Sequence, residues 1–149
     1  KTKIMATTTA TVSISSSDLQ PGNRLSINAS STLMKGGLTT GLTQLRTGYE
    51  SIATGTEFRL GPLATEMSGD THDIASWVYI CNKATDDTYY IDWGMHETMM
   101  GRLYAGDWMF IPWNASDDAA EIEIEAQVAA QDIEYAFFAS DFILTAAAS

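Results

Sequence analysis

The two histidines of this chain are among the side chains best able to bind a metal ion or take part in catalysis. His72 lies in the segment GDTHD, where Asp70 and Asp73 add two carboxylates to the imidazole. Calcium takes roughly six to eight oxygen ligands, and the segment lacks EF-hand spacing, so a solvated polar loop is the favoured interpretation. His96 precedes two methionines at 99 and 100, a set of soft donors that suits copper. A chain with seven methionines instead favours methionine as a filler of gaps in the core. We therefore predict no metal site.

Carboxylates and nucleophiles are the next candidates for chemistry. Glu121, Glu123 and Glu125 alternate with apolar residues in EIEIEAQV. In a β-strand they share one face at spacings of about 7 Å, with no basic residue nearby in the sequence. This pattern indicates a solvated outer face and not the carboxylate pair of a glycosidase. No G-x-S-x-G elbow occurs, and Cys81, in an apolar run, is expected to be a buried thiol. We predict no enzyme, no catalytic residue and no cofactor.

The composition excludes several classes of protein. The chain has 149 residues and a net charge of −11, which argues against binding nucleic acid. No apolar run approaches the roughly 20 residues that cross a bilayer, and no signal peptide is expected, so we predict no membrane association. The charge is uneven: residues 1–60 carry a net +3 and residues 61–149 a net −14. Such asymmetry is typical of a segment that docks on an acidic surface, although chance gives the same pattern with so few basic residues.

Turn signals divide the chain into short β-strands. Strands are expected over 6–17 and 24–34, separated by a Pro-Gly turn. Residues 74–82 are apolar on both faces, which predicts a central strand, paired in a hairpin with 88–95. Residues 108–113 are again apolar on both faces, and because of Pro112 that strand is expected to end there or to lie at an edge or bulge.

Two further strands follow, and together these segments define the fold class. In 121–128 the inner face comprises Ile122, Ile124, Ala126 and Val128, and in 133–140 one face comprises Ile133, Tyr135 and Phe137. With no convincing helix, the pattern predicts an all-β, two-sheet β-sandwich of Greek-key or jelly-roll type, although a closed barrel fits the pattern too. The aromatic run WMFIPW is expected to fill the space between the sheets.

The glycine-rich segment 35–57 is harder to place in this pattern. It carries leucines at 38, 42 and 45 and recurrent Thr and Gly, which predicts an extended N-terminal arm or loop with one helical turn at most. The expected organisation is therefore Thr/Ser/Gly-rich N-terminal strands and arm over 1–57, and a sandwich core over 58–149, both parts of one domain.

Several stretches resemble a known group of proteins. MATTTATVSISSSDL, GLTTGLTQ, VYICN, GRLYAGDWMFIPW and IEYAFF together resemble small virion proteins of tailed bacteriophages, especially phages of aquatic bacteria. The similarity is one of layout from about Met5 to Ala139, and residues 1–4 depart from it. Such proteins decorate or cement the capsid, or form knobs and tail parts, and no catalytic residue carries over.

The resemblance implies a virion structural protein on the outer surface of the capsid. Its expected partners are the major capsid protein and further copies of itself, with a homotrimer favoured because decoration sites fall at three-fold positions. The predicted contact residues come from the basic N-terminal part of the chain: Arg24, Lys35, Leu38, Leu42, Leu45, Arg46 and Arg59. The alternative for each is an ordinary surface charge or a leucine of the protein's own core.

Two other functions remain open from the sequence. A carbohydrate-binding or host-recognition module of a tail fibre needs an exposed aromatic platform, for which Trp93 and Trp113, at strand ends, are candidates. A head–tail connector or tail component would differ by assembling into six-fold or twelve-fold rings.

Overall fold

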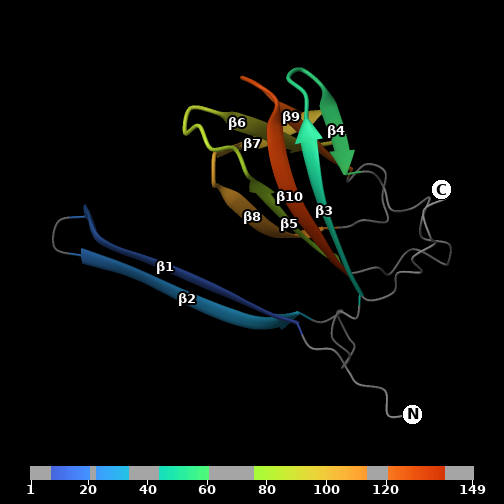
Figure 1. The fold of residues 1–149 in the computed structure, drawn as a ribbon. Helices are drawn as coiled ribbons and strands as arrows, with labels where there is room; N and C mark the ends of the chain where they lie inside the picture. Colours follow the sequence, from blue (N-terminus) through green and yellow to red (C-terminus); the bar gives the residue numbers. More distant parts are fainter. Residues whose placement is uncertain (1–7, 21–22, 34–43, 61–75, 114–120, 140–149) are drawn as a thin grey trace, which may run out of the picture.

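The computed structural model describes residues 8–20, 23–33, 44–60, 76–113 and 121–139. The regular elements in these ranges are β-strands (Figure 1). Within them, no helix is long and apolar enough to cross a membrane. The strands are β1 (Thr8–Gln20), β2 (Asn23–Leu33), β3 (Gln44–Ile52), β4 (Glu57–Leu60), β5 (Ser76–Asn82), β6 (Tyr90–Met95), β7 (Thr98–Tyr104), β8 (Trp108–Trp113), β9 (Ile122–Ala126) and β10 (Gln131–Ala139).

Eight of these strands form two four-stranded sheets, which pack as a β-sandwich. The first sheet has the order β3-β10-β5-β8, and the second has the order β4-β9-β6-β7. All neighbouring strands within the two sheets are antiparallel. The predicted all-β, two-sheet sandwich is confirmed.

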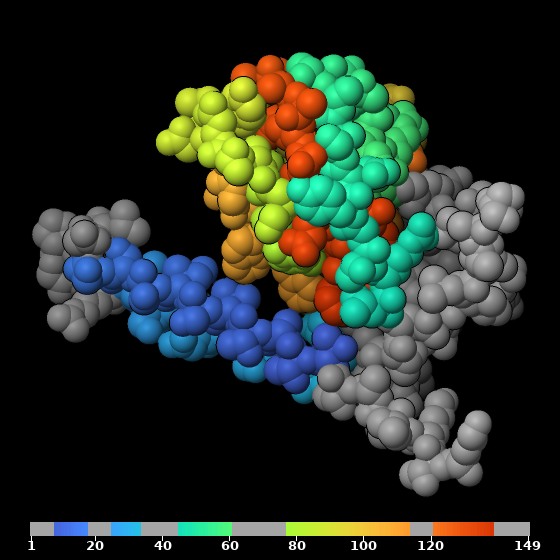
Figure 2. All heavy atoms as spheres, in the orientation of Figure 1, coloured from blue at the N-terminus to red at the C-terminus, as the bar shows by residue number. Residues whose placement is uncertain are grey.

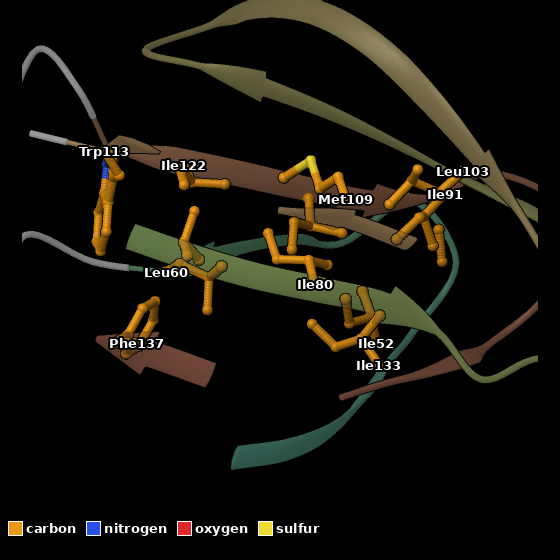
Figure 3. Close-up of a cluster of buried hydrophobic side chains, with 13 residues drawn as sticks. Ile52, Leu60, Ile80, Ile91, Leu103, Met109, Trp113, Ile122, Ile133 and Phe137 are labelled. Carbon is orange, nitrogen blue, oxygen red and sulfur yellow. The ribbon is translucent and has the colours of Figure 1, made fainter. Parts of the chain in front are cut away.

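The core between the sheets is built mainly from isoleucine. Ile80 of the first sheet and Ile91 and Ile122 of the second are fully buried, and they point into the space between the sheets (Figure 3). Burying each such side chain contributes about 1.5–3 kcal/mol relative to leaving it in water. The cluster comprises Ile52, Leu60, Val78, Ile80, Ile91, Leu103, Met109, Trp113, Ile122, Ile124, Ala126, Ile133 and Phe137.

Two strand predictions are confirmed by the order of the first sheet. β5 lies between β10 and β8, as its apolar residues on both faces predicted. β8 is an edge strand, which explains how Pro112 is tolerated, because a proline cannot donate a hydrogen bond to a neighbouring strand. The inner face predicted for 133–140 is also found, since Ile133 and Phe137 are buried and Tyr135 packs against the core.

Three local predictions are wrong. The segment at 88–95 does not pair with the segment at 74–82, because β6 belongs to the second sheet and β5 to the first. Residues 44–52 are not part of an arm: they form β3, which pairs along its length with β10. Strand pairing therefore crosses the expected division at residue 57. Val128 lies beyond the end of β9 and is 48% exposed, so it is not on the inner face.

β1 and β2 form a separate two-stranded ribbon. They pair antiparallel with each other and belong to neither sheet of the sandwich. The ribbon is long and projects from one end of the sandwich (Figure 1). The pair of strands predicted around the Pro-Gly turn is thus found, but as a projecting element and not as two strands of the sandwich.

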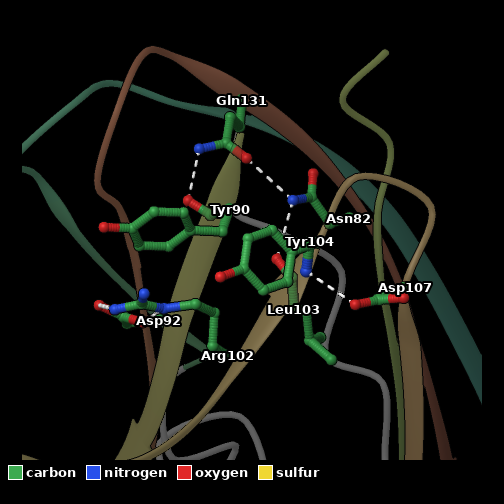
Figure 4. Close-up of polar contacts among 8 residues, drawn as sticks. All are labelled: Asn82, Tyr90, Asp92, Arg102, Leu103, Tyr104, Asp107 and Gln131. Atoms are coloured by element: carbon green, nitrogen blue, oxygen red, sulfur yellow. Dashed lines mark hydrogen bonds and ion pairs between the residues drawn. The ribbon is translucent and has the colours of Figure 1, made fainter. Parts of the chain in front are cut away.

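A buried amide pair joins the two sheets near one end of the core. Asn82 Nδ2 donates to Gln131 Oε1 at 2.9 Å and to the Leu103 carbonyl at 3.1 Å (Figure 4). Gln131 Nε2 donates to the Tyr90 carbonyl at 2.6 Å, and Asn82 Oδ1 accepts from the Ala84 amide at 3.0 Å. Because Asn82 and Gln131 belong to the first sheet and Leu103 and Tyr90 to the second, these hydrogen bonds fix how the sheets are offset.

We expect Asn82→Leu and Gln131→Leu each to lower the free energy of unfolding by about 1–3 kcal/mol, because each leaves buried polar partners unpaired. The double variant should cost less than the sum, since both single variants break the same amide–amide bond. Urea unfolding of all three proteins measures this. Gln127→Leu, at a half-buried site, is the matched control and should have little effect. Strictly additive costs would show that the two amides are not coupled.

Candidate functional site

Six aromatic side chains lie on the outward-facing side of the first sheet, together with polar residues such as Thr47 and Glu134. Side chains alternate along a strand, so Trp77 and Tyr79 point away from the core that Val78 and Ile80 fill. The strand register aligns these residues with Phe110 and its neighbours on β8, and with Phe138 and Leu45 on the other side. We call this surface the aromatic face; it comprises Leu45, Tyr49, Trp77, Tyr79, Trp108, Phe110 and Phe138.

The rings of the aromatic face pack against one another. Trp77 stacks on Phe110 with ring centroids 5.0 Å apart and an interplanar angle of 19°. Phe138 meets Phe110 edge-on at 5.8 Å, and Trp108 lies 6.4 Å from Tyr79. Such pairs contribute about 0.5–1.5 kcal/mol each beyond their buried area. The face is therefore a preformed surface of interlocked rings.

The aromatic face is open to solvent around the packed rings. Trp108 is 55% exposed, Tyr49 60% and Leu45 56%, whereas Trp77 and Phe110 are half-buried. The expectation that the run at 108–113 fills the core is thus wrong for Trp108 and Phe110, and right for Met109 and Trp113. Exposed apolar residues gathered in one patch mark a contact surface, in contrast to apolar residues scattered singly.

The tyrosines of the aromatic face are uncharged near neutral pH. Burial raises the pKa of Tyr79 to about 12, and its hydrogen bond with Cys81 acts in the same direction. Tyr49 donates a hydrogen bond to Asp132 Oδ2 at 3.0 Å, which also raises the Tyr49 pKa. The aromatic face therefore keeps its apolar character over the physiological pH range.

The outward-facing side of the second sheet is chemically different. Arg102 Nε donates to Asp92 Oδ1 at 2.8 Å, and its guanidinium lies 3.7 Å from the centroid of the Tyr90 ring (Figure 4). Hydrogen bonds to Asp92 and Tyr104 raise the pKa of Arg102, which stays charged. We call this surface the charged face; it comprises Glu57, Arg59, Tyr90, Asp92, Arg102, Glu121, Glu123 and Glu125.

Arg59 gathers three carboxylates on the charged face. It forms a hydrogen-bonded ion pair with Glu57 and a second with Glu121 Oε2 at 3.1 Å. Glu123 Oε1 lies 3.7 Å from Arg59 Nη2, within ion-pair range but too far for a hydrogen bond. The hydrogen bond with Glu57, followed by the charges of all three glutamates, raises the Arg59 pKa.

The prediction that the glutamates of 121–125 form a solvated face is wrong for Glu123. This side chain is only 1% exposed, and its Oε2 accepts the Glu97 amide hydrogen at 2.7 Å. Glu97 and His96 both have positive φ, at 64° and 45°, in the tight turn between β6 and β7. Non-glycine residues rarely adopt this conformation, so the Glu123 carboxylate holds a strained turn in place. Sequence spacing could not predict that Glu123 is buried beside Arg59, because these two residues meet only through the pairing of β4 with β9.

The described residues contain no group of three or more His, Cys, Asp and Glu side chains suited to a metal ion. Around His96, Met99 and Met100 are 45% and 58% exposed, so they do not fill gaps in the core. Cys81 is buried, as expected. His72 and its two aspartates lie outside the described residues. The described part of the sandwich thus has one outer face with exposed apolar side chains and one outer face with ion pairs.

The predicted contact residues do not form one surface. Leu45 lies on the aromatic face and Arg59 on the charged face, on opposite sides of the sandwich. Arg46 is half-buried in β3, and Arg24 belongs to β2 of the ribbon. Lys35, Leu38 and Leu42 lie outside the described residues.

The sequence did contain a signal for the aromatic face. It is the two-sided apolar character of 74–82 and 108–113, which we assigned to burial on both sides.

No protein-family model matches the chain, and no curated protein or solved structure shows significant similarity to it. The fold and the two faces define a two-sheet β-sandwich with one aromatic outer face and one ion-paired outer face.

We expect Arg59→Met to lower the urea midpoint of unfolding, because it leaves the buried Glu123 carboxylate beside other acids without a cation. Adding Glu123→Gln should restore part of the loss, since the amide oxygen still accepts the Glu97 N–H without a charge. The control is Arg102→Met, whose partner Asp92 is 18% exposed and keeps contact with water, so its effect should be smaller. A further fall on adding Glu123→Gln would contradict this account.

Proposed function

We propose that this protein is a phage virion structural protein that binds the outer surface of the assembled capsid as a decoration or cement protein. The observation that carries the proposal is the difference between the two outer faces of the sandwich. On the charged face, Arg59 and Arg102 are held by the protein's own carboxylates. On the aromatic face, Trp108, Tyr49 and Leu45 are exposed, which costs solubility unless the face is covered by a partner.

The strand wiring supports this proposal. Pairing is nested along the chain: β3 with β10, β4 with β9, β5 with β8 and β6 with β7. We infer that this is jelly-roll wiring, in which one long antiparallel hairpin is folded over into two sheets. Jelly rolls recur in viral capsid and lectin domains, although a fold by itself does not define a function.

The charge distribution suits a component that faces solvent on one side. Over the described sandwich ranges, 44–60, 76–113 and 121–139, four basic residues stand against twelve acidic ones, a net charge of −8. The aromatic face supplies an apolar contact to the major capsid protein, while the acidic remainder keeps the particle surface hydrated. On a capsid, many identical contacts act together, so each contact need only be moderate in strength. A homotrimer at three-fold positions is the assembly we favour.

We expect purified protein to bind stoichiometrically to capsids of its phage that lack it, and to raise their disruption temperature. Trp108→Ser combined with Leu45→Ser should weaken binding at least about tenfold, because each change removes exposed apolar area from one of the two edge strands of the aromatic face, area that only a partner would bury. Co-sedimentation with capsids and scanning calorimetry measure the two effects.

The matched control for this experiment is Tyr104→Ser combined with Met100→Ser. Tyr104 and Met100 are also large and exposed, at 45% and 58%, but they lie on β7 of the second sheet. The control should bind capsids like the unmodified protein. Equal losses in both double variants, or no binding by the unmodified protein at near-physiological salt, would refute the proposal.

A second candidate is carbohydrate recognition, favoured by the exposure of Trp108 beside Tyr79. The platform expected at Trp93 and Trp113 is not available. Trp113 is 4% exposed, and Trp93 packs against the core over Gly101, where a Cβ would lie 2.6 Å from the indole nitrogen. Binding on a glycan array that Trp108→Ser abolishes would favour this candidate, whereas an array without binding leaves the capsid role.

A further inference from the structure

The β1–β2 ribbon has two chemically different faces. Residues directly opposite each other in an antiparallel pair share a face, and Ile14 stands opposite Ile27. The neighbouring pairs on the same face are Val12 with Ala29 on one side, and Leu25 with Ser16 on the other, so the apolar residues are interrupted by a serine at one end. We call this surface the ribbon's apolar face; it comprises Ala10, Val12, Ile14, Leu25, Ile27 and Ala29.

The opposite face of the ribbon is polar and internally hydrogen-bonded. Ser13 Oγ donates to Asn28 Oδ1 at 2.8 Å, and Asn28 Nδ2 donates to Ser26 Oγ at 3.3 Å. The hydroxyls of Thr11 and Ser30 lie 3.3 Å apart. This face is suited to water, because its polar groups are small, uncharged and partnered across the strands.

Within the described residues, the middle of the apolar face is left in solvent, whereas Ala10 and Val12 are half-buried. Ile14 is 50% exposed, Leu25 44% and Ile27 45%, although Leu33 at the other end of the ribbon is buried. In Figure 2 the ribbon extends past the edge of the sandwich and does not fold back over it. A two-stranded ribbon with one uncovered apolar face is only marginally stable in water, so a second layer is needed.

Charge favours a second ribbon as that layer. Residues 8–20 and 23–33 contain one acid, Asp18, and one base, Arg24, so the ribbon is neutral, whereas the described sandwich ranges carry −8. Two ribbons therefore meet without like-charge repulsion, while two acidic sandwiches repel each other. A projecting ribbon also reaches a neighbour while the sandwiches stay apart.

We propose that the apolar face of the ribbon packs against the same face of the ribbon of a second copy of this chain. Two such ribbons form a small two-layer sandwich, with the aliphatic side chains of both interdigitating in a layer about 10 Å thick. The inference goes beyond capsid binding, because it concerns a two-fold contact between copies and makes no use of the aromatic face. Such a contact does not close a homotrimer but joins copies of neighbouring trimers.

The size of the ribbon sets the strength of this contact. Nine consecutive opposed pairs run from Thr8 to Ser16. At about 3.4 Å per residue and about 4.8 Å between strands, the face measures roughly 30 by 10 Å. Stable dimers bury about 800 Å² per partner, more than twice this footprint. Self-association through the ribbon alone is therefore weak and concentration-dependent, and copies held close together on one particle would be joined more firmly.

The test is sedimentation velocity of the full chain without capsids, over a series from about 1 to about 300 µM, where an interface of this size dissociates. We expect the unmodified protein to shift to larger species with concentration. Ile14→Thr combined with Ile27→Thr should remove the shift, because threonine keeps the preference for strand but removes the apolar surface.

The matched control is Ser15→Thr combined with Ser26→Thr. These two residues are also directly opposite each other, one position away on the polar face, and the control should self-associate like the unmodified protein. All four tryptophans, at 77, 93, 108 and 113, belong to the sandwich, so an unchanged tryptophan emission spectrum establishes that each variant keeps its sandwich.

Two results would overturn the inference. The first is a chain that stays monomeric at every concentration, or that associates equally well with both isoleucines replaced. The second is loss of association in Trp108→Ser, which would place the ribbon on the aromatic face of another copy. Failure of capsid binding with ribbon-dependent association intact would count against the proposed function only.

Discussion

The burial of isoleucine between the two sheets is the constraint on which the other features of this protein depend. Ile80, Ile91 and Ile122 meet in the core, and each one fixes the inward side of its strand. Since side chains alternate along a strand, the residues next to a core residue in the sequence point outward. The aromatic face and the charged face are both consequences of that single choice of register.

The side chains on the two outer faces of the sandwich are stabilised in different ways. On the second sheet, arginines and glutamates neutralise one another, and even the buried Glu123 is used to hold the strained turn at His96 and Glu97. On the first sheet, the rings cover one another but leave Trp108 open. A protein whose role is adhesion benefits from this division, because one face stays hydrated while the other is ready to bury area.

The ribbon extends the same logic outside the sandwich. Its strands alternate apolar and polar residues just as those of the sheets do, but Ile14, Leu25 and Ile27 on the apolar side stay exposed among the described residues. A neutral, projecting element of this kind is suited to contacts between copies, whereas the acidic sandwich is suited to solvent. In the proposed function, contacts between copies and attachment to the capsid would therefore use different surfaces.

The sequence by itself determined the fold class, most of the strands and which residues of β10 share a face, because these follow from a local period of two and from turn residues. Only the tertiary structure decided which strands pair. It placed 44–52 in the sandwich, moved β6 to the opposite sheet from β5, and turned the rings of Trp77 and Trp108 outward. It also brought Arg59 onto Glu123 across two strands distant in the chain. The physical reason is that alternation shows which residues share a face of a strand, but whether that face meets a second sheet or water is set by contacts between residues far apart in the sequence.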